Sequence, residues 1–174
     1  MRPVLAVFVV LTLLISGSVT AADQKGEIPI FPNVAFTAID GSSQTNLEAF
    51  RGRTVLLTFW ASWCGPCRQE LPELQRIYGE LAGSGFVLLT INMDSSPAIG
   101  ARFLKQNGIS VPVYRMDPRE LAALGLEALP TNVLIDREGR PAMYQRGYSP
   151  ELPGEIRRLV LEMDESQGGE STDP

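Results

Sequence analysis

The two cysteines of this 174-residue chain are separated by only two residues, in the segment Trp63-Cys64-Gly65-Pro66-Cys67. A disulfide that closes so short a loop removes little conformational entropy from the unfolded chain, so it would be a weak structural crosslink. A zinc site needs four ligands, and the chain contains no histidine and no third cysteine. The spacing therefore predicts a redox-active dithiol that opens and closes, with no bound metal and no other cofactor.

The elements on either side of the dithiol predict where each sulfur lies. Residues 53–60 form a mostly apolar run typical of a buried strand, and apolar side chains recur at helical spacing over residues 68–81. Cys64 is therefore expected to be exposed at the start of a helix, where unpaired N–H groups and the helix dipole stabilise a thiolate. We expect Cys64 to attack a partner's disulfide as the nucleophile and Cys67, one turn further along, to resolve the mixed disulfide. Pro66 suits the first helical turn, where its missing N–H costs little.

Two segments of the chain resemble the active site of thioredoxin-fold proteins. The first is residues 59–68, Phe-Trp-Ala-Ser-Trp-Cys-Gly-Pro-Cys-Arg, and the second is Leu129-Pro130-Thr131, which precedes the strand-like residues 132–136. In that family the proline of the second segment has a cis peptide bond and lies against the dithiol, with neighbouring backbone available to a bound partner chain. The resemblance implies a cis bond before Pro130 and a partner-binding surface made of Trp63, Gly65, Pro66, Leu129, Pro130 and Thr131.

Within that superfamily, the helix after the dithiol resembles the extracytoplasmic TlpA/ResA-like branch, whose members reduce disulfides, often in apocytochromes c. Residues 67–74, Cys-Arg-Gln-Glu-Leu-Pro-Glu-Leu, follow its C-[RK]-x-E-x-P-x-[LM] pattern. Cytosolic thioredoxins carry a buried aspartate in the preceding strand, where this chain has Thr58. Glu70 is the candidate replacement, because it shares a helix face with Cys67 and could accept the proton that Cys67 loses. The alternative is a solvated first-turn acid favoured by the helix dipole.

The N-terminus has the pattern of a secretory signal peptide over residues 1–22. Arg2 supplies a positive start, residues 4–15 are apolar apart from one threonine, and small residues lead to cleavage sites after Ala21 or Ala22. An uncleaved membrane anchor is the alternative, because residues 4–22 could nearly span a bilayer. Either case predicts an exported, periplasmic or extracytoplasmic protein. No glutathione pool re-reduces a dithiol there, so the resemblance implies a membrane electron donor of the CcdA or DsbD type.

The rest of the chain predicts one α/β domain over residues 23–163. We expect a thioredoxin fold, with a central mixed β-sheet between helices, an N-terminal β-hairpin, and a central insertion over residues 95–125. Strands are expected at residues 86–92 and 112–115, a hairpin at 131–136 and 141–146, and a last helix at 150–163. Residues 164–174 are acidic and predict a disordered tail. A net charge of −5 without a basic cluster argues against a nucleic-acid partner.

Three other residues near the dithiol have ordinary structural interpretations. Trp60 is expected in the core, Arg68 in solvent, and Asp94 within a segment that caps the helix starting near residue 96. We do not expect Asp94 to bind a metal.

These patterns predict a thiol-disulfide oxidoreductase that reduces disulfides in partner proteins. The first alternative is a DsbA-like thiol oxidase or isomerase, whose dithiol usually contains a histidine that is absent here. The second is a thiol peroxidase, whose Pro-x-x-x-[Thr/Ser]-x-x-Cys pattern neither cysteine follows, and the third is a non-enzymatic binding module, against which the intact dithiol argues. A cytochrome-specific reductant of the CcmG kind is a narrower form of the first prediction, but residues 127–131 differ from its Gly-Ala-Pro-Glu loop. Gly-Pro between the cysteines favours reduction.

Overall fold

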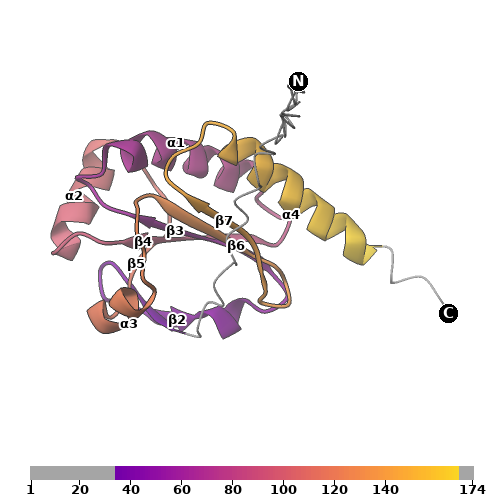
Figure 1. The fold of residues 1–174 in the computed structure, drawn as a ribbon, viewed down its shortest axis with the longest axis horizontal. Coiled ribbons are helices and arrows are strands. Elements are labelled where there is room, and N and C mark those ends of the chain that lie inside the picture. Colours follow the sequence, from indigo (N-terminus) through magenta and orange to yellow (C-terminus); the bar gives the residue numbers. More distant parts are fainter. Residues whose placement is uncertain (1–33, 169–174) are drawn as a thin grey trace, which may run out of the picture.

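A seven-stranded mixed β-sheet forms the centre of the computed structural model, which describes residues 34–168 (Figure 1). The strand order is β2-β1-β5-β4-β3-β6-β7. The two central strands run parallel and every one of their residues is buried, as expected for apolar strands covered on both faces. The strands are β1 (Ala35–Ala38), β2 (Gln44–Asn46), β3 (Thr54–Trp60), β4 (Phe86–Asn92), β5 (Val113–Arg115), β6 (Thr131–Ile135) and β7 (Pro141–Arg146).

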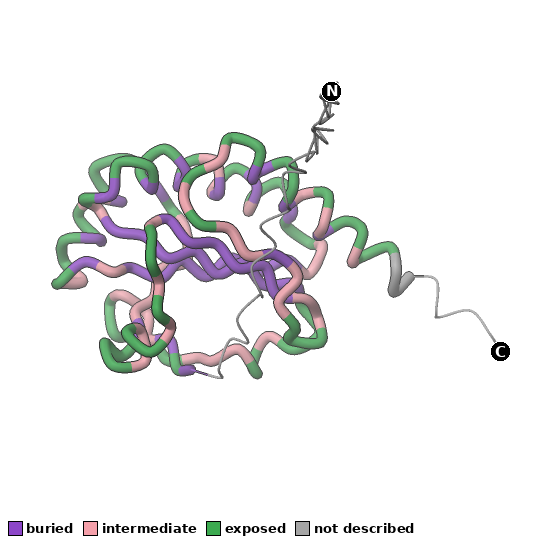
Figure 2. The backbone as a smooth tube through the Cα atoms, in the orientation of Figure 1, coloured by how far each residue is buried: buried purple, intermediate pink, exposed green. Residues whose placement is uncertain are grey.

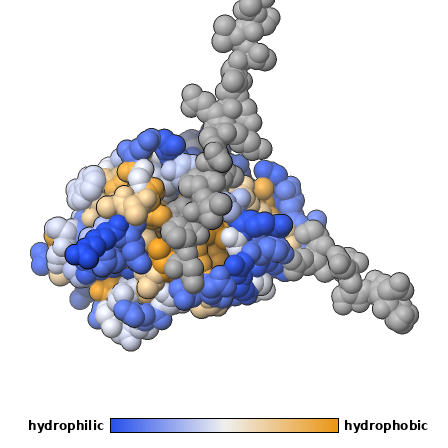
Figure 3. All heavy atoms as spheres, turned by 60° about the horizontal axis from the view of Figure 1, so that its bottom comes forward, coloured by the Kyte–Doolittle hydropathy of each residue, from blue (hydrophilic) through white to orange (hydrophobic). Residues whose placement is uncertain are grey.

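Helices lie on both sides of this sheet. In Figure 1, α1 (Gly65–Glu80), α2 (Pro97–Gln106) and α4 (Leu152–Gly168) lie on one side, whereas α3 (Pro118–Ala123) lies on the other, near β2 and the 3-10 turn η1 (Leu47–Phe50). Figure 2 shows that the buried residues concentrate in the central strands between these layers. The side that carries α3 comes forward in Figure 3, where hydrophilic residues dominate the periphery and hydrophobic residues gather nearer the middle.

Alternate residues of β3 point to opposite sides of the sheet, which divides the core. Val55, Leu57 and Phe59 pack in an apolar cluster on the side of α3. Leu56 packs on the other side against α1 and α4. Trp60 packs with Cys64, Cys67 and α2, which confirms its predicted place in the core. The dithiol therefore lies directly on buried packing and not on a surface loop.

The α/β class and the thioredoxin fold are confirmed, including the β1–β2 hairpin, the β6–β7 hairpin and an insertion of α2, β5 and α3 between β4 and β6. The dithiol helix begins at Gly65, which agrees with the predicted placement of Cys64 at the helix start and of Pro66 in the first turn. The last helix continues to Gly168, so residues 164–168 of the predicted tail are helical; an ion pair between Arg137 and Asp164 ties this end of α4 to the β6–β7 turn. The predicted signal peptide or anchor (residues 1–22) and the rest of the tail (169–174) lie outside the described residues. Over residues 34–168, no helix combines the length and apolar character needed to cross a membrane.

Candidate active site

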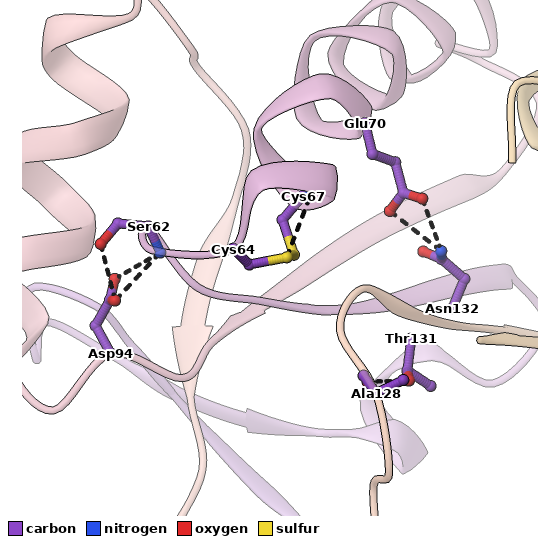
Figure 4. Close-up of a disulfide and its surroundings, with 8 residues drawn as sticks. All are labelled: Ser62, Cys64, Cys67, Glu70, Asp94, Ala128, Thr131 and Asn132. Atoms are coloured by element: carbon purple, nitrogen blue, oxygen red, sulfur yellow. Dashed lines mark hydrogen bonds between the residues drawn. A yellow bond between two sulfur atoms is a disulfide. The ribbon is translucent and has the colours of Figure 1, made fainter. Parts of the chain in front are cut away.

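Cys64 and Cys67 form a disulfide at the N-terminus of α1 (Figure 4), with their Cα atoms 5.3 Å apart. Cys64 is the N-cap residue of the helix, and its Sγ accepts a hydrogen bond of 3.1 Å from the backbone N–H of Cys67. After reduction, the same N–H group and the helix dipole would stabilise a thiolate on Cys64. The predicted position of Cys64 at the start of a helix is confirmed.

The predicted exposure of Cys64 is wrong, because only 5% of the residue is exposed and Cys67 is fully buried. Cys64 instead opens onto a groove of about 580 Å³, beside the side chain of Trp63, which is 71% exposed. The prediction missed Met93 and residues 126–128, which come from two other loops and form the far wall of the groove. The other lining residues of this groove are Gly65, Pro66 and Leu129.

The loop that precedes β6 forms one wall of the groove. The peptide bond between Leu129 and Pro130 is cis, as the resemblance implies. Leu129 lines the groove, but Pro130 is buried and Thr131 is completely buried. The Thr131 hydroxyl donates a 2.7 Å hydrogen bond to the carbonyl of Ala128 within the same loop (Figure 4). The Thr131 side chain therefore shapes the loop, and the contribution of Thr131 to partner binding stays a prediction that concerns its backbone.

Glu70 lies on the buried face of α1, one turn beyond Cys67, and only 2% of it is exposed. Burial excludes the alternative of a solvated surface acid. The side-chain Nδ2 of Asn132 donates hydrogen bonds of 3.1 Å to both carboxylate oxygens (Figure 4). Burial raises the pKa of Glu70 from 4.5 to about 7, while the hydrogen bond from Asn132 acts in the opposite direction. The carboxyl group can therefore gain or lose a proton near neutral pH.

Asp94 holds the loop that leads into the dithiol, a role that the sequence interpretation missed. Its carboxylate accepts hydrogen bonds from the backbone N–H of Ser62 (3.1 Å), the Ser62 hydroxyl (2.9 Å) and the side-chain amide of Asn92 (2.8 Å). The expected cap is not made: Ser96 is the N-cap of α2 and has no side-chain capping bond. The available signal was the position of Asp94 just after β4, the strand next to β3, because parallel strands end at the same edge of a sheet.

Replacing Asp94 with alanine is expected to destabilise the oxidised protein by about 2 kcal/mol, because the Ser62 N–H loses a charged acceptor. Urea denaturation of the oxidised protein measures this loss. The matched control is Asp40→Ala. Like Asp94, Asp40 accepts a hydrogen bond from a backbone N–H, that of Ser42, but its carboxylate is exposed. We expect little change in the control, and equal losses in the two variants would contradict a specific role for Asp94.

Arg68 is exposed, as predicted, and its guanidinium carbon lies 5.6 Å from the centroid of the Phe103 ring. Within residues 34–168, no group of three or more Cys, Asp or Glu side chains is arranged to hold a metal ion. The described site contains the dithiol and, one turn further along α1, the buried carboxyl of Glu70.

Comparisons with known proteins agree with this geometry. The Redoxin family profile matches residues 24–157. The thiol-disulfide oxidoreductase ResA of Bacillus cereus (strain ATCC 10987 / NRS 248) is 30% identical over 142 residues, which cover 76% of this chain and 82% of that protein. The family match includes the dithiol and all seven strands.

Two solved structures share the fold and part of the sequence. A secreted thiol-disulfide isomerase from Corynebacterium glutamicum matches with a TM-score of 0.65 and 29% identity, over 78% of this chain and 85% of that one. The exposed lipoprotein thioredoxin of Streptococcus pneumoniae strain TIGR4 matches with a TM-score of 0.63 and 27% identity, over 75% and 99% of the two chains. The chain therefore belongs to the Redoxin family, as a thiol-disulfide oxidoreductase of the ResA type whose redox pair is Cys64 and Cys67.

Proposed function

We propose that this protein reduces disulfide bonds in partner proteins outside the cytoplasm. The observation that carries the proposal is the placement of Cys64 at the N-terminus of α1, in a groove whose far wall consists of Met93 and residues 126–129 of the cis-proline loop. A partner segment in that groove brings its disulfide to Cys64 and to no other sulfur of the dithiol, because Cys67 is fully buried. Trp63, Gly65, Pro66 and Leu129 are then the contact residues on this chain, and the dithiol needs no other cofactor.

The reaction transfers two electrons from the dithiol to the partner. The Cys64 thiolate attacks one sulfur of the partner disulfide, forming a mixed disulfide and releasing the first partner thiolate, which takes a proton from water. Cys67 then loses its proton, and its thiolate attacks Sγ of Cys64. This step closes the Cys64–Cys67 disulfide and releases the second partner thiolate, so the partner is reduced and the dithiol is oxidised.

Glu70 is the proposed acceptor of the Cys67 proton. The thiol of Cys67 is buried, so its proton cannot pass directly to water, and Glu70 lies on the same buried helix face. A carboxyl group whose pKa is about 7 is half ionised near neutral pH, which suits it to accept and later return one proton. A carboxyl with an ordinary pKa would be a weaker base at the same position.

The proposed location and partners rest on the N-terminus and on the relatives. Residues 1–22 have a signal-peptide pattern, and the two similar solved structures are named as a secreted isomerase and as an exposed lipoprotein. Outside the cytoplasm the oxidised protein needs a reductant, and a membrane donor of the CcdA or DsbD type is the proposed source of electrons. Apocytochrome c, with its paired haem-attachment cysteines, is the proposed substrate within the wider class of disulfide-bearing proteins. Membrane association is expected only if residues 4–22 stay attached.

The reduction potential of the purified protein tests the direction of electron flow. We expect a value near or below about −250 mV, in the range of thioredoxin, measured by equilibration with dithiothreitol or glutathione buffers. Tryptophan fluorescence provides the signal, because Trp60 packs in the same cluster as both cysteines. The control is Cys64→Ser, which should show no redox-dependent change.

A potential near about −120 mV, in the range of DsbA, would instead make the protein an oxidant and overturn the proposal. Reduction of an oxidised apocytochrome c peptide, compared with reduction of insulin, tests the substrate. Equal rates on both would contradict selectivity for apocytochrome c while leaving the reductase activity intact.

A further inference from the structure

A chain of three buried side chains connects β3, β6 and α1 behind the dithiol. The Thr58 hydroxyl donates a 2.8 Å hydrogen bond to Oδ1 of Asn132, and Nδ2 of Asn132 donates to both oxygens of Glu70 at 3.1 Å (Figure 4 shows the second contact). Thr58 and Asn132 are completely buried. The sequence pattern points to Glu70 but assigns no role to Asn132, which precedes the apolar residues 133–135.

Strand register brings Thr58 and Asn132 together. β3 and β6 are antiparallel, and Thr58 lies directly opposite Asn132. The neighbouring pair on the same side of the sheet consists of Leu56, two residues before Thr58, and Leu134, two residues after Asn132, and both pack in the apolar cluster under α1 and α4. The polar pair is therefore enclosed, and burying such groups without hydrogen-bond partners is strongly unfavourable. Their mutual bonds, with Glu70 as the last acceptor, satisfy them.

We propose that Asn132, with its amide oriented by Thr58, is a positioning residue that holds the Glu70 carboxyl and keeps it able to accept the proton of Cys67. This inference rests on the proposed role of Glu70 in the resolving step. Asn132 touches neither the dithiol nor the groove in the contacts described, so it acts only through Glu70.

The direction of the hydrogen bonds explains the effect. A donor that faces a carboxyl group favours the ionised form, whereas an acceptor at the same place favours the protonated form. An asparagine amide can turn over and present either atom. Because the Thr58 hydroxyl donates to Oδ1, Asn132 presents Nδ2, the donor, to Glu70.

No other charged group competes for Glu70 in the described structure. Cys67 is the other titratable residue on the buried face of α1, and Arg68 beside it is exposed. β7 places the uncharged Gln145 opposite Asn132, and the buried residues of α4 in the adjoining cluster are apolar. Burial and the Asn132 hydrogen bond are the two influences on the carboxyl, and they oppose each other.

The first test replaces Asn132 with leucine, which has a similar size and no donor. In the oxidised protein, carbon-13 NMR of the Glu70 carboxyl should show its titration midpoint raised by about one pH unit, because a hydrogen bond to a charged group is lost. When the reduced protein reacts with a partner disulfide, the rate at which Cys67 resolves the mixed disulfide depends on pH. The midpoint of that pH profile should rise by the same amount. A midpoint for the carboxyl that stays at its wild-type value would overturn the inference.

The second test addresses Thr58 with a matched pair of variants. Thr58→Val keeps the shape but removes the hydroxyl, so the amide of Asn132 loses its orientation and the carboxyl midpoint should rise. Thr58→Ser keeps the hydroxyl, and its carboxyl midpoint should stay at the wild-type value. A rise in both variants, or in neither, would contradict orientation by Thr58, and this pair also tests the inference if Asn132→Leu does not fold.

Different results would contradict the role of Glu70 as proton acceptor and the positioning of Glu70 by Asn132. If Glu70→Gln leaves the pH profile of resolution unchanged, Glu70 is not the proton acceptor and the proposed mechanism is wrong. The NMR midpoints would still report whether Asn132 and Thr58 control the carboxyl, so the network is tested separately from its use in the reaction.

Discussion

Replacing Cys64 with serine is expected to lower the rate of disulfide reduction to that of the uncatalysed control. Cys64 is the sulfur that opens onto the groove, and Cys67 is fully buried and cannot substitute for it. A serine hydroxyl at the same place forms no mixed disulfide with the partner. Insulin reduction, followed by turbidity in the presence of dithiothreitol, measures the loss.

The companion variant, Cys67→Ser, should retain the first attack but lose the second. The mixed disulfide with the partner then has no internal thiolate to resolve it and accumulates, which mass spectrometry under non-reducing conditions detects. The double variant is the control and should trap nothing. Activity that survives in Cys64→Ser, or a mixed disulfide formed through Cys67, would contradict the assignment of the two roles.

The second large effect is a fall in stability with rising pH that depends on Glu70. In the folded protein the pKa of Glu70 is about 7, against an ordinary value of 4.5 in the unfolded chain. Between these values the folded state binds the proton that the unfolded state has released, so the free energy of unfolding decreases as pH rises. The decrease is about 1.4 kcal/mol per pH unit and about 3 kcal/mol in total, complete just above pH 7.

Urea denaturation of the oxidised protein at pH values from 4.5 to 8 measures this dependence. The chain has no histidine, and both cysteines are held in the disulfide, so few other groups titrate in this window. Glu70→Gln replaces the carboxyl with a neutral group of similar shape, and its stability should change little with pH. At pH 8 the free energy of unfolding of this variant should be larger than that of the wild type.

The matched control is Glu155→Gln, which changes an exposed carboxyl in the first turn of α4. This variant should follow the wild-type curve at every pH. Parallel curves for Glu70→Gln and the wild type would show that burial of Glu70 does not raise its pKa. The stability that burial of Glu70 is expected to cost at neutral pH also has a functional meaning. A buried ionisable group that destabilises the fold is typical of a site that moves protons.

Local sequence patterns predicted most of the elements that carry the site. The apolar run of β3, the helical spacing of α1 and the two residues between the cysteines are properties of short segments, and each had its predicted structure. The end of α4 was less well predicted, because the helix continues to Gly168, and its Asp164 forms an ion pair with Arg137 of the β6–β7 turn. Such contacts depend on residues that are distant along the chain.

The sequence by itself determined the dithiol and the α/β class, because each is encoded by residue type and local spacing, and the resemblance of residues 129–131 to thioredoxin-fold proteins implied the cis bond before Pro130. Only the tertiary structure decided the surroundings of the dithiol. The partner of Glu70 is Asn132, 62 residues away, and the partner of Asp94 is Ser62, 32 residues away. The order and register of the strands bring these residues together, and a one-residue shift in register would turn Asn132 to the other side of the sheet. No local pattern contains that information, since the pairing is the result of packing the whole sheet.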